Sequence, residues 1–85
     1  MPHELSTVNL SPAQCRAARG LLDWSQEQLA QASGLSRSTV RDFESGRHEP
    51  HRGSMILILQ TLAAQGVEPF PAATGLGEGV RFRVL

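Results

Sequence analysis

Three short segments of the chain repeat one pattern, which is typical of the start of a helix. In each segment an apolar residue precedes a serine, and a second apolar residue follows five positions after the first. The three pairs are Leu10 and Cys15 around Ser11, Trp24 and Leu29 around Ser25, and Leu35 and Val40 around Ser36. This is the spacing of a hydrophobic staple that flanks an N-cap. Three helices are therefore expected to begin at or just after these serines.

Glutamines and glycines sharpen the limits of these helices. Gln14 and Gln28 stand three residues after the first two serines, where each completes a capping box. Gly34 and Gly46 are natural left-handed C-caps. The expected helices run from Ser11 to Gly20 or the Leu22–Asp23 region, from about Gln26 to Ser33, from about Arg37 to Ser45 and from about Arg52 to Gln65. The short connection between the second and third helices predicts a tight turn that sets them at a large angle.

The last part of the chain, residues 67–85, has a different character. Pro69 and Pro71 prevent a helix, and residues 80–84 alternate apolar and basic side chains at the period of a strand. One strand alone is not stable, so it must pair either with residues 67–70 of its own chain or with the same segment of a partner. We therefore expect four helices followed by a short C-terminal β-strand.

Composition excludes several classes of protein. A chain of 85 residues forms one domain. Its eight arginines are balanced by eight acidic residues, and this formal net charge of zero argues against a protein that coats nucleic acid by bulk charge. A local basic patch remains compatible with that total. The single cysteine excludes a disulfide framework and a cysteine-based zinc site.

Neither a membrane span nor a catalytic site is expected. The longest apolar run is Met55 to Leu59, which is too short to cross a bilayer, and the first ten residues lack the apolar core of a signal peptide. These features indicate a soluble, cytoplasmic protein. The sequence shows no acid–base pair, nucleophile or phosphate-binding loop, so we expect no enzyme, no cofactor and no metal site.

A run of short motifs occupies residues 24–47. It reads Ser-Gln-Glu-x-Leu-Ala, then Ala-x-Gly-Leu-Ser, then a β-branched residue, then Glu-x-Gly-Arg. This run resembles the helix-turn-helix of the phage repressor/Cro (XRE) family, and with the first and fourth helices the resemblance covers residues 10–66. It implies an all-α fold, a compact bundle of four to five helices. In this fold the second and third helices form a DNA-binding unit, with the third helix in the major groove. The chain then divides into an N-terminal arm (1–9), a DNA-binding domain (10–66, with the helix-turn-helix at about 25–46) and a C-terminal tail (67–85) expected to dimerise.

The third expected helix carries the candidates for reading bases. Arg37 and Arg41 are four residues apart, so they lie on one face of that helix. Arginine can hydrogen-bond bidentately to the O6 and N7 atoms of guanine. The resemblance implies that the base-contacting positions are Arg37, Ser38 and Arg41, with Asp42 as a further candidate. The alternative is a solvated helix face on which Arg41 contacts Glu44 or Ser45.

A second group of residues is expected to hold the phosphates of the DNA. The cations that follow the third helix, which include His48, are closely spaced on a short loop, and this suits phosphate contact. Gln26 stands at a helix N-terminus, where exposed N–H groups favour an anion. The full set is Gln26, Ser36, Thr39, Arg47, His51 and Arg52. Helix capping is the equally weighted alternative for Ser36 and Thr39, and Gln26 can be an ordinary neighbour of a cap.

Two further groups have structural roles. By resemblance, Arg19 and Glu44 form a partly buried ion pair that ties the first helix to the third. The residues expected at a dimer interface are Met55, Ile58, Val80, Phe82 and Val84, because the fourth helix is apolar over a wide arc and the strand needs a partner. The tail has two alternative roles. Arg81 and Arg83 can extend the surface that contacts DNA, or the strand can bind another protein.

The leading hypothesis is a transcriptional regulator, a repressor that binds double-stranded DNA as a homodimer on a palindromic operator. Its half-site centres are expected about 34 Å apart. One alternative is an antitoxin-like regulator that also binds a protein toxin through its tail. The other is a protein-interaction module that has lost DNA binding, which the zero net charge and the acids Asp42 and Glu44 on the third helix support.

Overall fold

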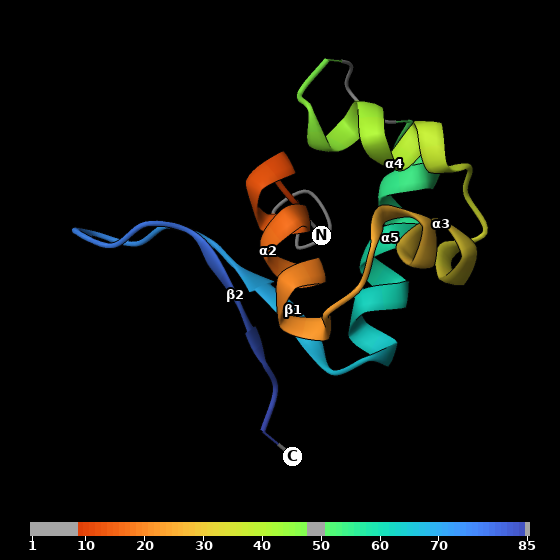
Figure 1. The fold of residues 1–85 in the computed structure, drawn as a ribbon. Coiled ribbons are helices and arrows are strands. Elements are labelled where there is room, and N and C mark those ends of the chain that lie inside the picture. The colour runs from red at the N-terminus through yellow and green to blue at the C-terminus, as the bar shows by residue number, and fades with distance from the viewer. Residues whose placement is uncertain (1–8, 48–50, 85) are drawn as a thin grey trace.

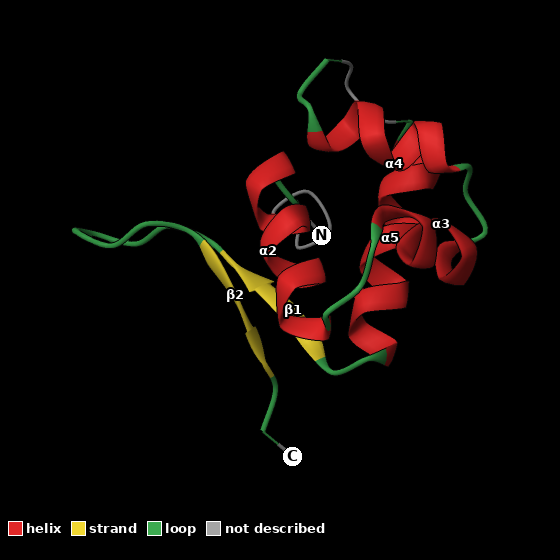
Figure 2. Cartoon of the chain, viewed as in Figure 1, coloured by secondary structure: helices red, strands yellow, loops and turns green. Residues whose placement is uncertain are grey.

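The computed structural model describes residues 9–47 and 51–84. Within them the elements follow one another as α2 (Pro12–Leu22), α3 (Gln26–Ser33), α4 (Arg37–Glu44), α5 (Arg52–Ala64), β1 (Val67–Phe70) and β2 (Gly79–Phe82), as Figure 2 shows. The expected bundle of four helices is confirmed, and each helix agrees with its expected bounds to within a residue or two. No fifth helix lies in this part of the chain. The all-α description is corrected, because two strands form a small antiparallel sheet.

The helix starts form as the repeated pattern predicts. Ser11 accepts a hydrogen bond from the Gln14 N–H, Ser25 accepts one from the Gln28 N–H, and each glutamine side chain returns a bond to its cap backbone. Ser36 caps α4 by accepting from the Thr39 N–H at 3.1 Å. These bonds satisfy N–H groups that have no partner inside a helix, which fixes where each helix begins. The three expected N-caps are confirmed.

The core lies where the helices and the first strand meet. Its buried apolar residues are Leu10, Cys15, Ala18, Leu29, Ala30, Val40, Phe43, Ile58, Leu62 and Val67. Both members of the Leu10–Cys15 staple are among them, and Trp24 and Leu35 from the other two staples pack against the cluster. Helices α3 and α4 therefore face the core with one side each and expose the other. Among the described residues, no helix is long and apolar enough to cross a membrane.

The C-terminal strand pairs within its own chain. β2 lies antiparallel to β1, with Val67 opposite Phe82 and Pro69 opposite Val80. Of the two pairings that the sequence left open, the structure therefore has the internal one. Beyond the paired strands the connection projects as a long arm, and a bridge between Ala73 and Leu76 closes its tip (Figure 1).

Gln14 attaches this hairpin to the helices. Its side-chain amide donates to the carbonyl oxygens of Phe70 at 3.1 Å and Gly79 at 3.0 Å, while its oxygen accepts from the Ser11 N–H at 2.8 Å. Val67 is buried and Val80 packs half-buried against the core. One glutamine thus serves both a helix cap and the hairpin, and the segment after residue 66 packs on the helical domain.

One of the residues expected at a dimer interface lies inside the protomer instead, and a second packs half-buried against the core. Ile58 has no exposed surface, so its assignment to the interface is wrong. The buried residues of α5 are Ile58 and Leu62, so the side of the helix that carries them faces the core. Val80 is turned toward the same core. The large apolar residues that α5 exposes are Ile56 at 44 % and Leu57 at 41 %.

Candidate nucleic-acid interface

The turn between α3 and α4 is fixed by backbone hydrogen bonds. Gly34 ends α3 and adopts a left-handed conformation with φ of 78°. A residue with a Cβ adopts this conformation less readily than glycine does. The next N–H, that of Leu35, donates to the Ala30 carbonyl at 2.9 Å, and Ser36 then caps α4. Only two residues separate the end of α3 from the cap of α4. The direction of α4 relative to α3 is therefore set locally.

Helix α4 buries one face and exposes the other. Val40, Phe43 and Glu44 are buried, whereas Arg37, Ser38 and Arg41 are exposed and Asp42 is half-buried. The structure thus leaves three of the four base-contacting candidates exposed on α4, and the fourth, Asp42, partly so. Their contact with bases stays a prediction.

Arg41 has one weak partner on its own helix. Its Nε atom lies 3.6 Å from Oδ1 of Asp42, and its side chain is 59 % exposed. An ion pair this long and this solvated contributes little to stability. The alternative contact with the Glu44 carboxylate does not form, because that group has other partners. Arg41 is therefore free to turn toward a ligand in front of the helix.

Three hydroxyls gather at the N-terminus of α4. The Ser36 hydroxyl lies 2.8 Å from that of Thr39 and 3.2 Å from that of Ser38. The capping role of Ser36 is therefore present, and its expected contact with phosphate stays a prediction. Exposed hydroxyls beside free N–H groups at a helix start are compatible with both roles.

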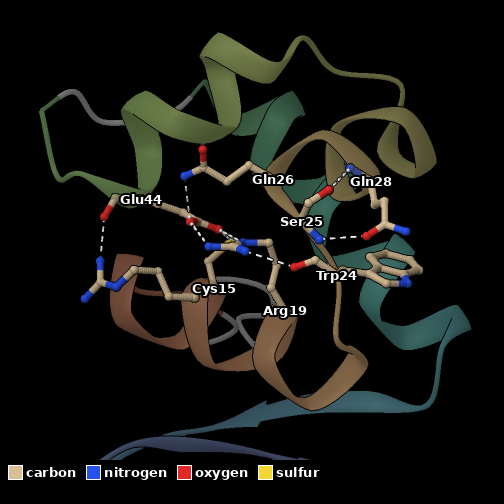
Figure 3. A network of polar contacts seen from close by, with 8 residues as sticks. Cys15, Arg19, Trp24, Ser25, Gln26, Gln28 and Glu44 are labelled. Carbon is tan, nitrogen blue, oxygen red and sulfur yellow. Dashed lines mark hydrogen bonds and ion pairs between the residues drawn. The ribbon is translucent and has the colours of Figure 1, made fainter.

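The Glu44 carboxylate is the centre of a buried network (Figure 3). Arg19 donates to both of its oxygens, from Nη2 at 2.7 Å and from Nε at 2.8 Å. Gln26 donates to Oε1 at 3.1 Å and Cys15 to Oε2 at 3.1 Å. Arg19 also donates to the Trp24 carbonyl at 3.0 Å. The ion pair expected between Arg19 and Glu44 is present, and it joins α2, α3 and α4 at one point.

Gln26 is oriented inward by this network. Its side-chain amide donates one hydrogen bond to the Glu44 carboxylate, and the residue is half-buried. Its expected phosphate contact stays a prediction that relies on its other amide hydrogen or its backbone N–H. This support for Glu44 could not be predicted from the sequence, because glutamine is common near the start of a capped helix for several reasons.

The network shifts the pKa values of its members. Burial raises the pKa of the Glu44 carboxyl, but the hydrogen bonds from Arg19, Gln26 and Cys15 together outweigh it, and the pKa lies below the ordinary value. The hydrogen bond to Glu44 raises the pKa of Arg19. Burial, followed by the bond to Glu44, raises the pKa of the Cys15 thiol far above its usual range. Cys15 therefore stays a thiol, which is unsuited to nucleophilic chemistry.

Stability is expected to fall in acid partly through Glu44. Because its pKa is lower in the folded than in the unfolded chain, its contribution is complete above the unfolded value of about 4.3 and is lost as the pH falls through the folded value. Denaturant unfolding of the native protein and of Glu44→Gln, measured across this acidic range, checks the expectation. The difference in unfolding free energy should be largest near neutral pH and shrink below about pH 4. A difference independent of pH would contradict it.

Exposed cations flank the end of α4. Arg47 lies just beyond the helix, where its N–H donates to the Asp42 carbonyl at 3.2 Å, and His51 and Arg52 begin α5. All three are exposed, whereas His48 lies outside the described residues. Because Arg19 occupies the Glu44 carboxylate, Asp42 is the one acid with a free carboxylate edge among the described residues from 37 to 52. The surface around α4 is therefore basic although the whole chain is neutral.

The described residues do not bring metal-ligating side chains together. Among residues 9–47 and 51–84, no three histidine, cysteine, aspartate or glutamate side chains gather closely enough to hold a metal ion. What the arrangement offers is a rigid helix with arginines and hydroxyls on its outer face and cations at its end. Such a surface can place guanidinium groups at base edges and phosphates.

Comparison with known families agrees with this geometry. A family model described as helix-turn-helix matches residues 16–64, which is more than half of the chain. The match takes in most of α2 and all of α3, α4 and α5. A search of curated proteins gives no match.

Proposed function

The chain belongs to the helix-turn-helix family of the phage repressor/Cro (XRE) type and is a DNA-binding transcription regulator, and from this premise we propose that it is a cytoplasmic repressor that binds a palindromic operator as a homodimer. The observation that carries the proposal is the exposed basic face of α4, held on its inner side by Val40, Phe43 and Glu44. Each protomer presents one such helix to a half-site, and the two half-sites are centred about 34 Å apart. Occupying an operator that overlaps a promoter is sufficient for repression.

In this proposal the two sets of polar residues have different tasks. Arg37, Ser38 and Arg41 read base edges in the major groove, and Asp42 accepts a hydrogen bond from a cytosine amino group. Contacts to phosphate set the position of the protein without selecting a sequence. The phosphate-contacting set is Gln26, Ser36, Thr39, Arg47, His51 and Arg52.

The homodimer is assigned to the exposed face of α5. Ile56 and Leu57 are exposed there, with Met55 half-buried beside them. The sequence has no charged residue between Arg52 and Glu68. A two-fold interface sets the same patch of both protomers against itself, so an uncharged apolar face avoids bringing like charges together.

Selection of bound fragments from the host genome tests the function directly. The protein is incubated with sheared genomic DNA at a low and a high salt concentration, and the retained fragments are sequenced. We expect an enriched motif with two inverted halves whose centres are about one helical turn apart, and weaker retention at high salt. Fragments retained without a common motif, or no retained fragment at all, would overturn the proposal. A single half-site would overturn the homodimer alone.

Two arginine variants distinguish the proposed base contacts from the proposed phosphate contacts. Arg41→Ala should cost about 1–3 kcal/mol of binding free energy and relax the preference at one base position. Arg47→Ala, the matched control, should weaken all sequences about equally and lower the slope of log K against log salt by about one. Fluorescence anisotropy with the selected operator and its single-base variants measures both effects. Identical behaviour of the two variants would contradict the assignment.

A further inference from the structure

The two outer edges of the hairpin differ in their hydrogen-bonding groups. The Arg83 N–H donates to the Gly66 carbonyl at 2.7 Å, so these two residues form a hydrogen-bonded pair of the antiparallel ladder. Hydrogen-bonded and non-bonded pairs alternate in such a ladder. The pairs of Val67 with Phe82 and of Pro69 with Val80 are therefore non-bonded, and their N–H and C=O groups point to the outer edges.

One of these edges is closed and the other is open. On β1 the outward positions are the buried Val67 and Pro69, which has no N–H to donate. On β2 they are Val80 and Phe82, and no side-chain or loop hydrogen bond within the described part of the chain reaches their backbone groups. β2 also forms the outer side of the hairpin in Figure 1. The free edge of β2 can therefore accept one more strand.

The side chains along β2 define which strand would fit. One face exposes apolar side chains, with Phe82 at 50 % and Val84 at 97 %. The other face carries Arg81 and Arg83, which share the single carboxylate of Glu68 at 2.8 and 3.4 Å. Two cations against one anion leave an unbalanced positive charge on that face.

We propose that the open edge of β2 binds an extended segment of another protein in which apolar and acidic residues alternate. The segment adds a third strand by hydrogen bonding to the backbone of Val80 and Phe82. Its apolar side chains lie beside Phe82 and Val84, and its carboxylates face Arg81 and Arg83. Backbone bonds supply the affinity, and the alternation of charge selects the partner.

A second copy of the chain fits this edge poorly. An antiparallel pairing of β2 with itself that covers Phe82 and Val84 sets Arg81 opposite Arg83 of the copy, or Arg83 opposite itself. Like charges directly opposite each other destabilise a pair of strands. This replaces the expectation that Phe82 and Val84 form the dimer. The proposal does not rest on DNA binding, because β2 lies on the other side of α2 from α4 (Figure 1).

Labelled synthetic peptides test the charge requirement on the full chain. One is a short capped peptide of alternating valine and glutamate, and the other carries lysine in place of glutamate. Fluorescence anisotropy should show the acidic peptide binding at least about tenfold more tightly. The triple variant Glu68→Arg/Arg81→Glu/Arg83→Glu keeps the internal pairing with reversed signs, and it should prefer the lysine peptide. Equal binding of both peptides, or no binding of either, would overturn the proposal.

A second pair of variants tests the backbone edge. Phe82→Pro removes an outward N–H and no ladder bond, so it should abolish peptide binding, whereas Phe82→Val keeps the N–H and should retain it. Thermal unfolding verifies that each variant is folded. If Phe82→Pro does not fold, the peptide preference of the triple variant tests the proposal. A dimer that becomes a monomer in Phe82→Pro would assign the edge to a second copy and overturn the proposal. Operator binding is measured on the same samples, so failure of the regulator function is seen separately.

Discussion

Replacing Glu44 by alanine is expected to lower the free energy of unfolding by about 3–5 kcal/mol. The change removes the carboxylate that Arg19, Gln26 and Cys15 share, and it leaves an arginine side chain that is only 19 % exposed without its partner. An unpaired charge in such a place costs more than the pair contributes. The loss is a large part of the stability of a domain of this size. Urea unfolding at neutral pH, followed by circular dichroism, measures it.

Two further variants show whether the loss comes from the unpaired charge. Glu27→Ala removes an exposed acid from the first turn of α3 and should cost no more than about 1 kcal/mol. The double variant Arg19→Met/Glu44→Leu removes both charges and should recover much of the stability, because apolar residues can replace a buried pair. A Glu44→Ala cost as small as that of Glu27→Ala would show that the network contributes little.

Gln14→Glu is expected to destabilise the protein by about 2–3 kcal/mol although it preserves the capping box. Glutamate serves as well as glutamine at this position of a helix start. The side-chain amide of Gln14, however, donates to the carbonyl oxygens of Phe70 and Gly79, and a carboxylate oxygen in its place would face both without a proton. The residue is 5 % exposed, so water cannot repair the loss.

Gln28→Glu is the matched control for this prediction. Gln28 holds the same position in the capping box of α3, where it is exposed and bonds only to Ser25 among the described residues. Its replacement should leave stability unchanged or raise it slightly, since a negative charge suits a helix N-terminus. Thermal and denaturant unfolding of the two variants gives the comparison. Equal effects would show that the hairpin does not depend on Gln14.

The helices could be predicted closely because their signals are local. A cap and its staple lie within a few residues of each other, and the bonds of Ser11, Ser25 and Ser36 need no other part of the chain. The ion pair between Arg19 and Glu44 is not local, and only the family resemblance suggested it.

Other features could not be predicted because they depend on tertiary contacts. Gln14 and Gln28 look the same in the sequence, and only the position of the hairpin makes the first one a docking residue. The apolar arc of α5 gave no reason to place Ile58 inside and Ile56 outside. Strand β2 had two partners available, and the choice between them depended on how residues 67–70 leave the end of α5.

The residues of α4 that stabilise the fold and those proposed to contact bases lie on different faces of the helix. The residues that hold the helix, Val40, Phe43 and Glu44, all point inward, whereas Arg37 and Arg41 make no bond to another element among the described residues. Exchanging the outer side chains therefore leaves the packing intact. Under the proposed function, selection or design can therefore change the preferred operator by exchanging these outer side chains, without first stabilising the fold.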